Sequence, residues 1–253
     1  MTSQVPRIFS SGRRALRLAR ALTRQRQDGA ATFIWEDIAE EMVERLAFVR
    51  HEPRRALVTG PCPAPLEKYL ADSGERIEDG KDFDLEAPFE RGGFDFIAVL
   101  GQLDAVNDLP GALIHLRNAL EPGGLVIASF VGGQSLPALR AAMLAAEPDR
   151  PAARMHPLVD HRAAPGLLQR AGWKDPVVDT QALTIRYSAL DTLVSDLRDQ
   201  ALGSALADAA PPLGKAALAR ARAAFLDQAD EDGKTSERIE IVTLTGRRSL
   251  AGT

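Results

Sequence analysis

Few residues of this chain have side chains suited to catalysis or metal binding. Cys62 is its one cysteine, and it follows a short apolar run that we expect to be a strand. Loops after strands of α/β proteins bind ligands, but a lone cysteine without a histidine partner is usually inert. His156 and His161 are five residues apart with Pro157 between them. They do not share a helix face, so we expect no metal site.

The loop around Cys62 is rich in proline and reads Gly60-Pro-Cys-Pro-Ala-Pro65. Gly60 either lets the backbone approach a ligand or simply forms the turn after the strand. The prolines have a fixed φ and carry no amide proton. This loop therefore offers few backbone donors to an anionic ligand.

A second loop brings Asn107 and Asp108 directly before an expected helix. Both residue types cap helices by accepting hydrogen bonds from first-turn amides, and we favour this role. The alternative is a catalytic role, because this loop also follows a strand at the ligand-binding edge of the expected sheet.

Periodic apolar runs define the elements that would position these loops. Continuous apolar strands that alternate with amphipathic helices indicate a parallel α/β sheet. We expect helices at 12–27, 36–50, 65–70, 109–120, 136–146, 164–171, 189–202 and 214–230, and strands at 55–59, 94–100, 125–130, 176–180, 183–187 and 237–245.

Charge is distributed unevenly along the 253 residues. Residues 1–30 hold seven arginines and one acid, which gives a charge of +6. Because the formal net charge of the whole chain is −4, residues 31–253 carry a charge of −10. An acidic body argues against DNA binding. Gly12–Gln27 is expected to be a helix with Ala15, Leu18, Ala19 and Leu22 on one face and arginines on the other.

This basic helix has three interpretations, which we rank. The first is a lid on the site, with its arginines in water or paired with the acidic body. The second is docking of a protein partner, and the third is peripheral contact of Arg13–Arg26 with an anionic membrane. No apolar run is long enough to span a membrane and no signal peptide is evident, so we expect a cytoplasmic protein.

Eight stretches together resemble the class I S-adenosylmethionine-dependent methyltransferases. They are Phe94–Leu100, Val106–Leu113, Leu116–Leu125, Gly132–Arg140, His156–Asp160, Leu167–Gly172, Val177–Asp179 and Thr184–Tyr187. Within that family the chain looks like the complex I assembly-factor arginine hydroxylases and the malonyl-acyl-carrier-protein methyltransferases of biotin synthesis. The resemblance covers nearly the whole chain.

The resemblance implies an S-adenosylmethionine pocket and places residues in it. His156 takes a substrate-side position by the same comparison, and Asp84-Leu85 matches the family's acidic pair near the adenine. The positions that the resemblance assigns to the cofactor pocket are Gly60, Cys62, Ala64, Asp84, Leu85, Leu100 and Gly101.

The chain departs from the family in three ways. The first-strand loop of the family reads acidic-x-Gly-x-Gly-x-Gly, but here the acid position is Val58, and Cys62 and Ala64 replace glycines. Only 33 residues separate Gly60 from Phe94, where two helices and two strands need about 45–50. We therefore expect the second strand or the following helix to be shortened or missing, with neither Glu78 nor Asp79 after a convincing strand.

The third departure lies after the strand 94–100. The branch has a His-Trp pair before its Val-Asn-Asp-Leu-Pro run, and Asp104-Ala105 stands here instead.

These observations predict a Rossmann-like class I methyltransferase sheet, shortened in its strand 2/3 region. We expect a helical lid at 1–50, with a basic arm at 1–30, and an α/β domain at 51–253 with a helical insertion at about 189–230. The eroded loop favours a non-catalytic or weakly active protein that binds S-adenosylmethionine weakly or not at all and acts through a protein partner, for example in respiratory-complex assembly. The alternative is an active methyltransferase or hydroxylase on a protein or small-molecule substrate.

Overall fold

The chain forms one six-stranded sheet in the order β2-β1-β3-β4-β6-β5. The computed structural model describes residues 7–27, 29–72, 75–78, 84–149 and 151–250, with the backbone alone for 75–78. The strands are β1 (Arg55–Thr59), β2 (Glu75–Glu78), β3 (Phe94–Leu100), β4 (Leu120–Val131), β5 (Lys174–Tyr187) and β6 (Thr235–Arg247).

Strands β2, β1, β3 and β4 are parallel, and β6 is antiparallel to both β4 and β5. All seven residues of β3 are buried, as expected for a strand covered on both faces. The two strands expected at 176–180 and 183–187 are parts of the single strand β5, which lies at the edge of the sheet.

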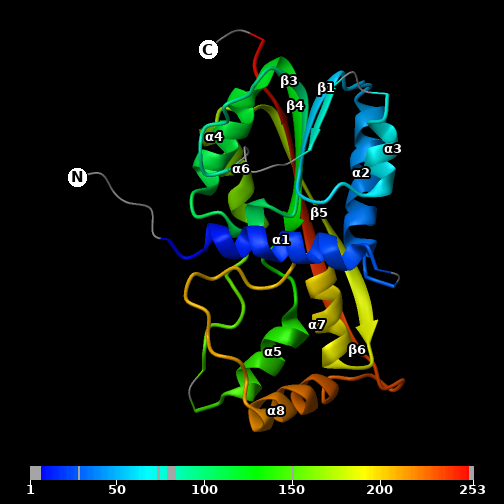
Figure 1. Ribbon diagram of the computed structural model, residues 1–253, viewed down its shortest axis with the longest axis vertical. Helices are drawn as coiled ribbons and strands as arrows, with labels where there is room; N and C mark the ends of the chain where they lie inside the picture. The colour runs from blue at the N-terminus through cyan, green and yellow to red at the C-terminus, as the bar shows by residue number, and fades with distance from the viewer. Residues whose placement is uncertain (1–6, 28, 73–74, 79–83, 150, 251–253) are drawn as a thin grey trace, which may run out of the picture.

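Helices cover both faces of the parallel half of the sheet (Figure 1). Helices α2 and α3 pack on one face, and α4 and α6 on the other. The α-helices are α1 (Ser11–Gln25), α2 (Phe33–Phe48), α3 (Ala64–Tyr69), α4 (Leu109–Ala119), α5 (Pro137–Ala146), α6 (Ala164–Arg170), α7 (Leu190–Asp199) and α8 (Lys215–Leu226), with short 3-10 turns η1 (Leu103–Ala105) and η2 (His161–Ala163).

Helix α1 crosses the carboxyl ends of the parallel strands (Figure 1). Strands β5 and β6 continue beyond it, and helices α5, α7 and α8 gather around their far ends. The predicted insertion corresponds to α7 and α8, which lie between β5 and β6 in the chain. Helix α1 therefore lies between the sheet-forming half of the molecule and this helical half.

The segment between β1 and β3 is short, as predicted. Within its described residues it contains one helix, α3, and one strand, β2. The expectation that Glu78 follows no convincing strand is wrong, because Glu78 is the last residue of β2 and pairs in register with Val58. The four-residue β2 is too short to give a clear period-2 pattern, which explains the error. Asp79 lies outside the described residues.

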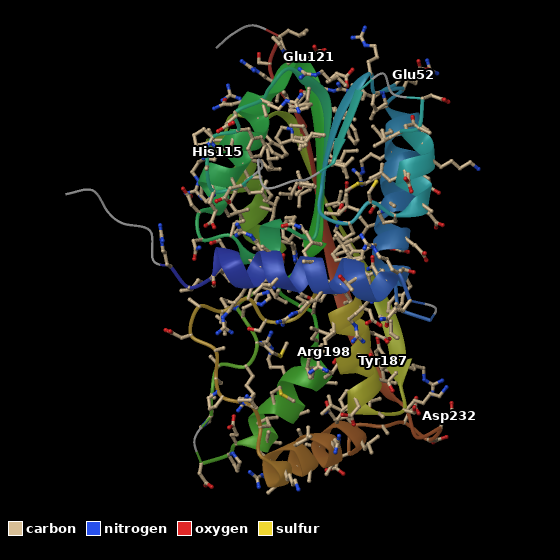
Figure 2. The ribbon with its side chains drawn as sticks, viewed as in Figure 1. Glu52, His115, Glu121, Tyr187, Arg198 and Asp232 are labelled. Carbon is tan, nitrogen blue, oxygen red and sulfur yellow. The ribbon has the colours of Figure 1, made fainter. Side chains whose placement is uncertain are left out.

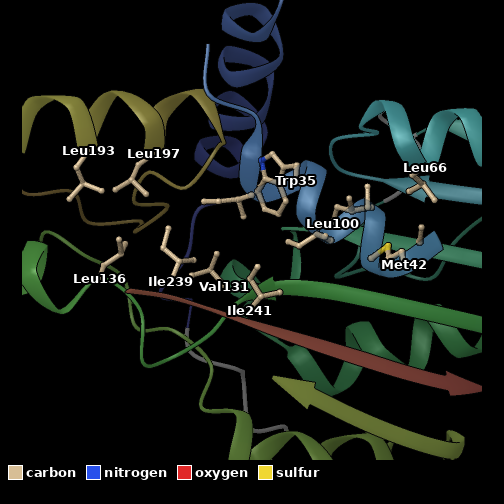
Figure 3. Packing of buried hydrophobic residues seen from close by; sticks show 14 of the residues in the cluster. Trp35, Met42, Leu66, Leu100, Val131, Leu136, Leu193, Leu197, Ile239 and Ile241 are labelled. Carbon is tan, nitrogen blue, oxygen red and sulfur yellow. The ribbon is translucent and has the colours of Figure 1, made fainter. Parts of the chain in front are cut away.

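Trp35 of α2 joins the two halves of the core. Its side chain is 1% exposed, and its Nε1 donates to the carbonyl of Gln200 at 2.9 Å. The indole lies against Gly101, where an added Cβ would be 2.2 Å from the ring. Figure 3 shows Trp35 between the leucines of α7 and Leu100 of β3. Gly101, with φ of +64°, is therefore glycine because of both its backbone and this contact.

We predict that Trp35→Ala lowers the free energy of unfolding by about 3–5 kcal/mol, the usual cost of deleting a buried aromatic side chain. Urea unfolding followed by circular dichroism measures the change. Trp35→Phe is the control, because it keeps most of the volume and removes the hydrogen bond to Gln200, which costs about 1 kcal/mol. A loss of less than 1 kcal/mol for the alanine variant would show that the indole is not central to the core.

Candidate functional site

The candidate site lies where the chain reverses its direction across the sheet. From β1 the chain passes to β2 on one side, and it then returns to β3 on the other side of β1. Ligands of open α/β sheets bind in the crevice at such a switch point, outside the carboxyl ends of the strands. The loops that follow β1 and β3 form this edge, and they carry most of the positions predicted from the sequence.

Gly60 is required by the fold itself. Its φ is +91°, and an added Cβ would lie 2.0 Å from the carbonyl oxygen of Leu100. The loop after β1 thus passes directly against the end of β3, which only glycine permits. This geometry accounts for Gly60 as the turn residue that the sequence analysis offered as one of its two interpretations.

Backbone donors are sparse in the rest of this loop. Between Gly60 and Leu66, proline occupies every second position, which leaves the amides of Cys62 and Ala64. The side chain of Cys62 is half-buried and packs against the core, while Ala64 begins α3 and is exposed. These two positions are near the predicted pocket, but their chemistry differs from that of a glycine-rich cradle.

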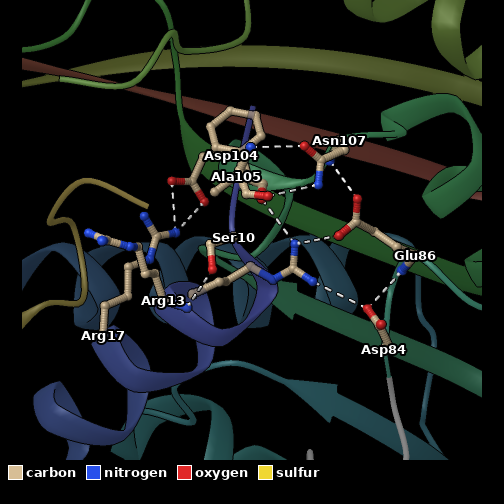
Figure 4. A network of polar contacts seen from close by, with 10 residues as sticks. Ser10, Arg13, Arg17, Asp84, Glu86, Asp104, Ala105 and Asn107 are labelled. Carbon is tan, nitrogen blue, oxygen red and sulfur yellow. Dashed lines mark hydrogen bonds and ion pairs between the residues drawn. The ribbon is translucent and has the colours of Figure 1, made fainter. Parts of the chain in front are cut away.

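Arg14 of α1 binds Asp84, the acid expected near the adenine, and also the neighbouring Glu86 (Figure 4). Nη2 of Arg14 lies 3.2 Å from Oδ1 of Asp84, and its Nη1 lies 3.1 Å from Oε2 of Glu86 and 3.0 Å from the carbonyl of Ala105. Arg14 is 8% exposed. Burial by itself raises the pKa of Glu86, but hydrogen bonds from Asn107 and Arg14 lower that pKa below its ordinary value. Leu85 is buried in the core.

Asp104 is the second acid bound by α1, and sequence analysis treated it only as a departure from the family. Nη2 of Arg17 lies 3.0 Å from each of its carboxylate oxygens, and Nε2 of His156 lies 3.3 Å from its Oδ2. Burial alone raises the pKa of Asp104, but the charge of Arg17 and the contact with His156 lower it. A fully buried carboxylate is kept ionised by two partners.

His156 is oriented by the loop that follows α7. Its Nδ1 accepts a hydrogen bond from the amide of Ala205 at 3.4 Å, and Nε2 faces the Asp104 carboxylate at 3.3 Å without forming a hydrogen bond. The ring also makes an edge contact with Phe9, with centroids 5.5 Å apart. His156, predicted to lie on the substrate side, is therefore at the site, but its side chain contacts Asp104.

Asn107 and Asp108 have structural partners of their own. The Asn107 side chain accepts a hydrogen bond from the backbone N–H of Phe9 at 2.9 Å and donates one to its carbonyl at 3.2 Å. The backbone N–H of Asn107 donates to Oε1 of Glu86 at 2.7 Å. Oδ1 of Asp108 accepts from the amide of Gly111 at 2.9 Å and caps α4. The capping role favoured for this pair is confirmed for Asp108, while Asn107 ties the N-terminal segment to the site.

The orientation of α1 differs from the simplest interpretation of its pattern. An apolar face would ordinarily pack inward, but Leu22 is exposed and the buried residues of α1 are Arg14 and Ala21. The inward face carries Arg14, Arg17 and Arg24, which pair with Asp84, Glu86, Asp104 and Asp199. The spacing of Arg14, Arg17 and Arg24 places them on one face, a signal that the sequence held. Both arrangements offered for these arginines occur, since Arg14, Arg17 and Arg24 pair with acids of the body while Arg13 and Arg20 are exposed to water.

Comparisons with known proteins agree with this architecture. No family model matches the chain. It is 28% identical to malonyl-[acyl-carrier protein] O-methyltransferase of Halorhodospira halophila, over 92% of this chain and 87% of that protein. It is 23% identical to the mitochondrial arginine-hydroxylase NDUFAF5 of Danio rerio, over 96% of this chain and 86% of that protein.

A solved structure supports the same fold. A Bacillus halodurans protein assigned as a methyltransferase superposes with a TM-score of 0.51 at 11% identity, over 82% of this chain and 98% of that one. The chain therefore has a class I methyltransferase fold with a short segment between β1 and β3, and it is similar in sequence to a methyltransferase and an arginine hydroxylase.

The structure also bears on membrane spanning. In the described parts of the chain, every helix is too short or too polar to cross a bilayer.

We predict that Asp104→Asn lowers the free energy of unfolding by about 3–5 kcal/mol at neutral pH, because it leaves the buried guanidinium of Arg17 without a counter-charge. The folded-state pKa of Asp104 is depressed. Its contribution is therefore present above the unfolded-state pKa of about 3.9 and is lost as the pH falls through the folded-state pKa. The difference between the two proteins should shrink in acid, as measured by urea unfolding from pH 7 to pH 3.

Asp191→Asn is the matched control, since Asp191 also pairs with an arginine, Arg222, but on the surface. Exposed pairs contribute little to stability, so this variant should unfold like the wild type. Equal stability of Asp104→Asn and the wild type at neutral pH would contradict the role given to the buried pair.

Proposed function

We propose that this chain is a methyltransferase-fold protein that binds S-adenosylmethionine weakly or not at all and acts through a protein partner, as a non-catalytic or weakly active member of its fold. The observation that carries the proposal is the loop Gly60–Pro65. Class I enzymes hold the methionine carboxylate of the cofactor with backbone amides of a glycine-rich loop at this place. Here alternate residues are prolines, and Gly60 is explained by its contact with Leu100.

The contacts of Arg14 add a second argument. An adenosine held near Asp84 would have to share that carboxylate with a buried guanidinium that also binds Glu86. Removing Arg14 from these partners would take a donor from the largely buried carboxylate of Glu86 and from the buried carbonyl of Ala105. Unpaired buried polar groups cost free energy, so the closed arrangement of α1 competes with the cofactor.

The packing of Trp35 adds a third argument. Gly101 is among the positions that the family resemblance assigns to the cofactor, and here the buried indole lies against its Cα. A ligand atom at that point would have to displace Trp35 and break the hydrogen bond to the Gln200 carbonyl. The donor set and the packing of this edge therefore do not fit S-adenosylmethionine in the usual class I manner.

The outer face of α1 is the surface that we assign to the partner. Arg13, Arg20 and Arg26 are exposed there, together with Leu16, which is 55% exposed. Helix α1 contains no acidic residue, so every charge on this face is positive and the face fits an acidic protein surface. The chain is similar to the arginine-hydroxylase NDUFAF5, and it resembles the complex I assembly-factor arginine hydroxylases. We therefore favour an assembling respiratory complex as the partner. The cytoplasmic location stays a prediction.

One observation favours the alternative of an active methyltransferase or hydroxylase. The acid that holds the cofactor ribose in this family ends the second strand, and Glu78 ends β2. Sequence similarity to a methyltransferase over most of the chain points the same way. The two candidates differ in their response to the cofactor.

We predict that millimolar S-adenosylmethionine or S-adenosylhomocysteine leaves the melting temperature of the protein unchanged in differential scanning calorimetry. A ligand present at 100 times its dissociation constant adds about 2.7 kcal/mol to stability, which a scan detects readily. A clear increase in the melting temperature would contradict the proposal and favour the active enzyme.

A loop variant tests the argument from missing backbone amides in the same calorimetric scan. Pro61→Gly, Cys62→Gly, Pro63→Arg and Ala64→Gly together restore amide donors and backbone freedom after Gly60. This variant should show a larger ligand-induced shift than the wild type. If the unmodified protein responds as strongly, the argument from missing amides is wrong.

We predict that Arg13→Glu with Arg20→Glu reduces recovery of respiratory-complex subunits at least fivefold when the tagged protein is cross-linked and purified from cells that naturally contain it. Quantitative mass spectrometry gives the ratio to the wild type. Arg140→Glu with Arg162→Glu is the matched control, since both arginines are exposed away from α1. Unchanged recovery with the α1 variant would contradict the assignment of the docking face.

A further inference from the structure

A cavity opens on the far side of α1, in the helical half of the molecule, and Asp104 and His156 of the candidate site form part of its wall. Its volume is about 290 Å³, and it lies between the end of β4, helices α5 and α7, and the loops 154–158 and 202–204. Small-molecule sites have volumes of roughly 300–1,000 Å³. The cavity is therefore at the lower end of this range and suits a small ligand.

The walls of this cavity are mainly apolar. Figure 3 shows Leu197 of α7 pointing toward Leu136 and Val131 from the opposite side. Further apolar groups come from both helices, and they are Leu139, Met143 and Val194. Such a lining favours a hydrocarbon body over a sugar or a phosphate, which would leave its hydrogen-bonding groups unsatisfied.

The charged residues at the cavity differ in whether they are neutralised. Asp104 is held by Arg17 and His156, as described above. Arg154 is paired with Glu147, with nitrogen–oxygen distances of 2.7 and 2.8 Å.

Arg198 is different from both. It is exposed on α7, and no hydrogen bond or ion pair links its guanidinium to any residue that the structure describes. Figure 2 places Arg198 between α5 and α7. The cavity therefore combines apolar walls with one guanidinium that forms no hydrogen bond or ion pair with the described residues.

We propose that this cavity binds a small amphipathic carboxylate, with its hydrocarbon body against the leucines and its carboxylate on Arg198. A guanidinium is well suited to such a head group, because it donates two parallel hydrogen bonds to a carboxylate. The apolar body supplies affinity by leaving water. The inference is independent of the proposed function, because it concerns neither the Gly60 loop nor the outer face of α1.

Isothermal titration with sodium octanoate tests the proposal, and octanamide serves as the uncharged ligand of the same length. Octanoate should bind with a stoichiometry of one. Octanamide should bind about tenfold more weakly, a difference of about 1.4 kcal/mol, because it makes no charge-assisted bond to Arg198. Absence of octanoate binding, or equal affinities for the two ligands, would overturn the proposal.

Variants assign the binding to this cavity. Arg198→Gln should erase the preference for octanoate, while Arg140→Gln, an equal charge change on the exposed face of α5, should preserve it. Met143→Trp should block both ligands by filling the cavity. Val194→Trp fills it from α7 and replaces Met143→Trp if that protein does not fold.

Two results with these variants would overturn the assignment. The first is octanoate binding of wild-type strength by Arg198→Gln. The second is undiminished binding by a folded cavity-filling variant. Both results leave the scan with S-adenosylmethionine unaffected, so the two proposals fail separately.

Discussion

The buried ion pair between Arg17 and Asp104 is the interaction on which the arrangement of the site depends. Asp104 lies at the carboxyl end of the parallel sheet and is almost fully buried, and an isolated carboxylate there would be prohibitively unfavourable. Arg17 supplies the counter-charge and also donates to the carbonyl of Gly203 at 2.9 Å. The same guanidinium thereby joins α1 to the sheet edge and to the loop after α7. Breaking it would leave the contacts of Arg14 to hold α1 on the sheet edge and those of Arg24 and Gln25 to hold it on α7.

This constraint explains why a basic helix lies on an acidic protein with its arginines inward. Three arginines of α1 satisfy carboxylates beneath it, and the remaining basic residues face outward. In the family that the chain resembles, this edge receives a cofactor, whereas here arginines of α1 pair with the acids along it. Together with the proline-rich loop, these ion pairs are the basis of our proposal that the chain acts through a protein partner.

The sequence predicted the strands more fully than the site. The strands 55–59 and 94–100 coincide with β1 and β3, because buried apolar runs bounded by turn residues are a strong local signal. Capping by Asp108 was likewise predictable, since it depends on neighbouring residues. The pairing of Arg17 with Asp104 joins residues 87 positions apart, and no local pattern shows which of several acids meets which arginine. The same holds for the orientation of α1, three of whose arginines face the protein interior because acids far away in the sequence lie there.

Hydrogen exchange of α1 tests the central claim most directly, because the claim is that ion pairs hold this helix on the carboxyl edge without any ligand. Mass spectrometry would follow the amides of Ser11–Gln25 in the free protein and with millimolar S-adenosylhomocysteine. The account predicts strong protection comparable to that of β3, the same in both samples. Rapid exchange of α1 in the free protein, with protection gained only when the ligand is added, would contradict it.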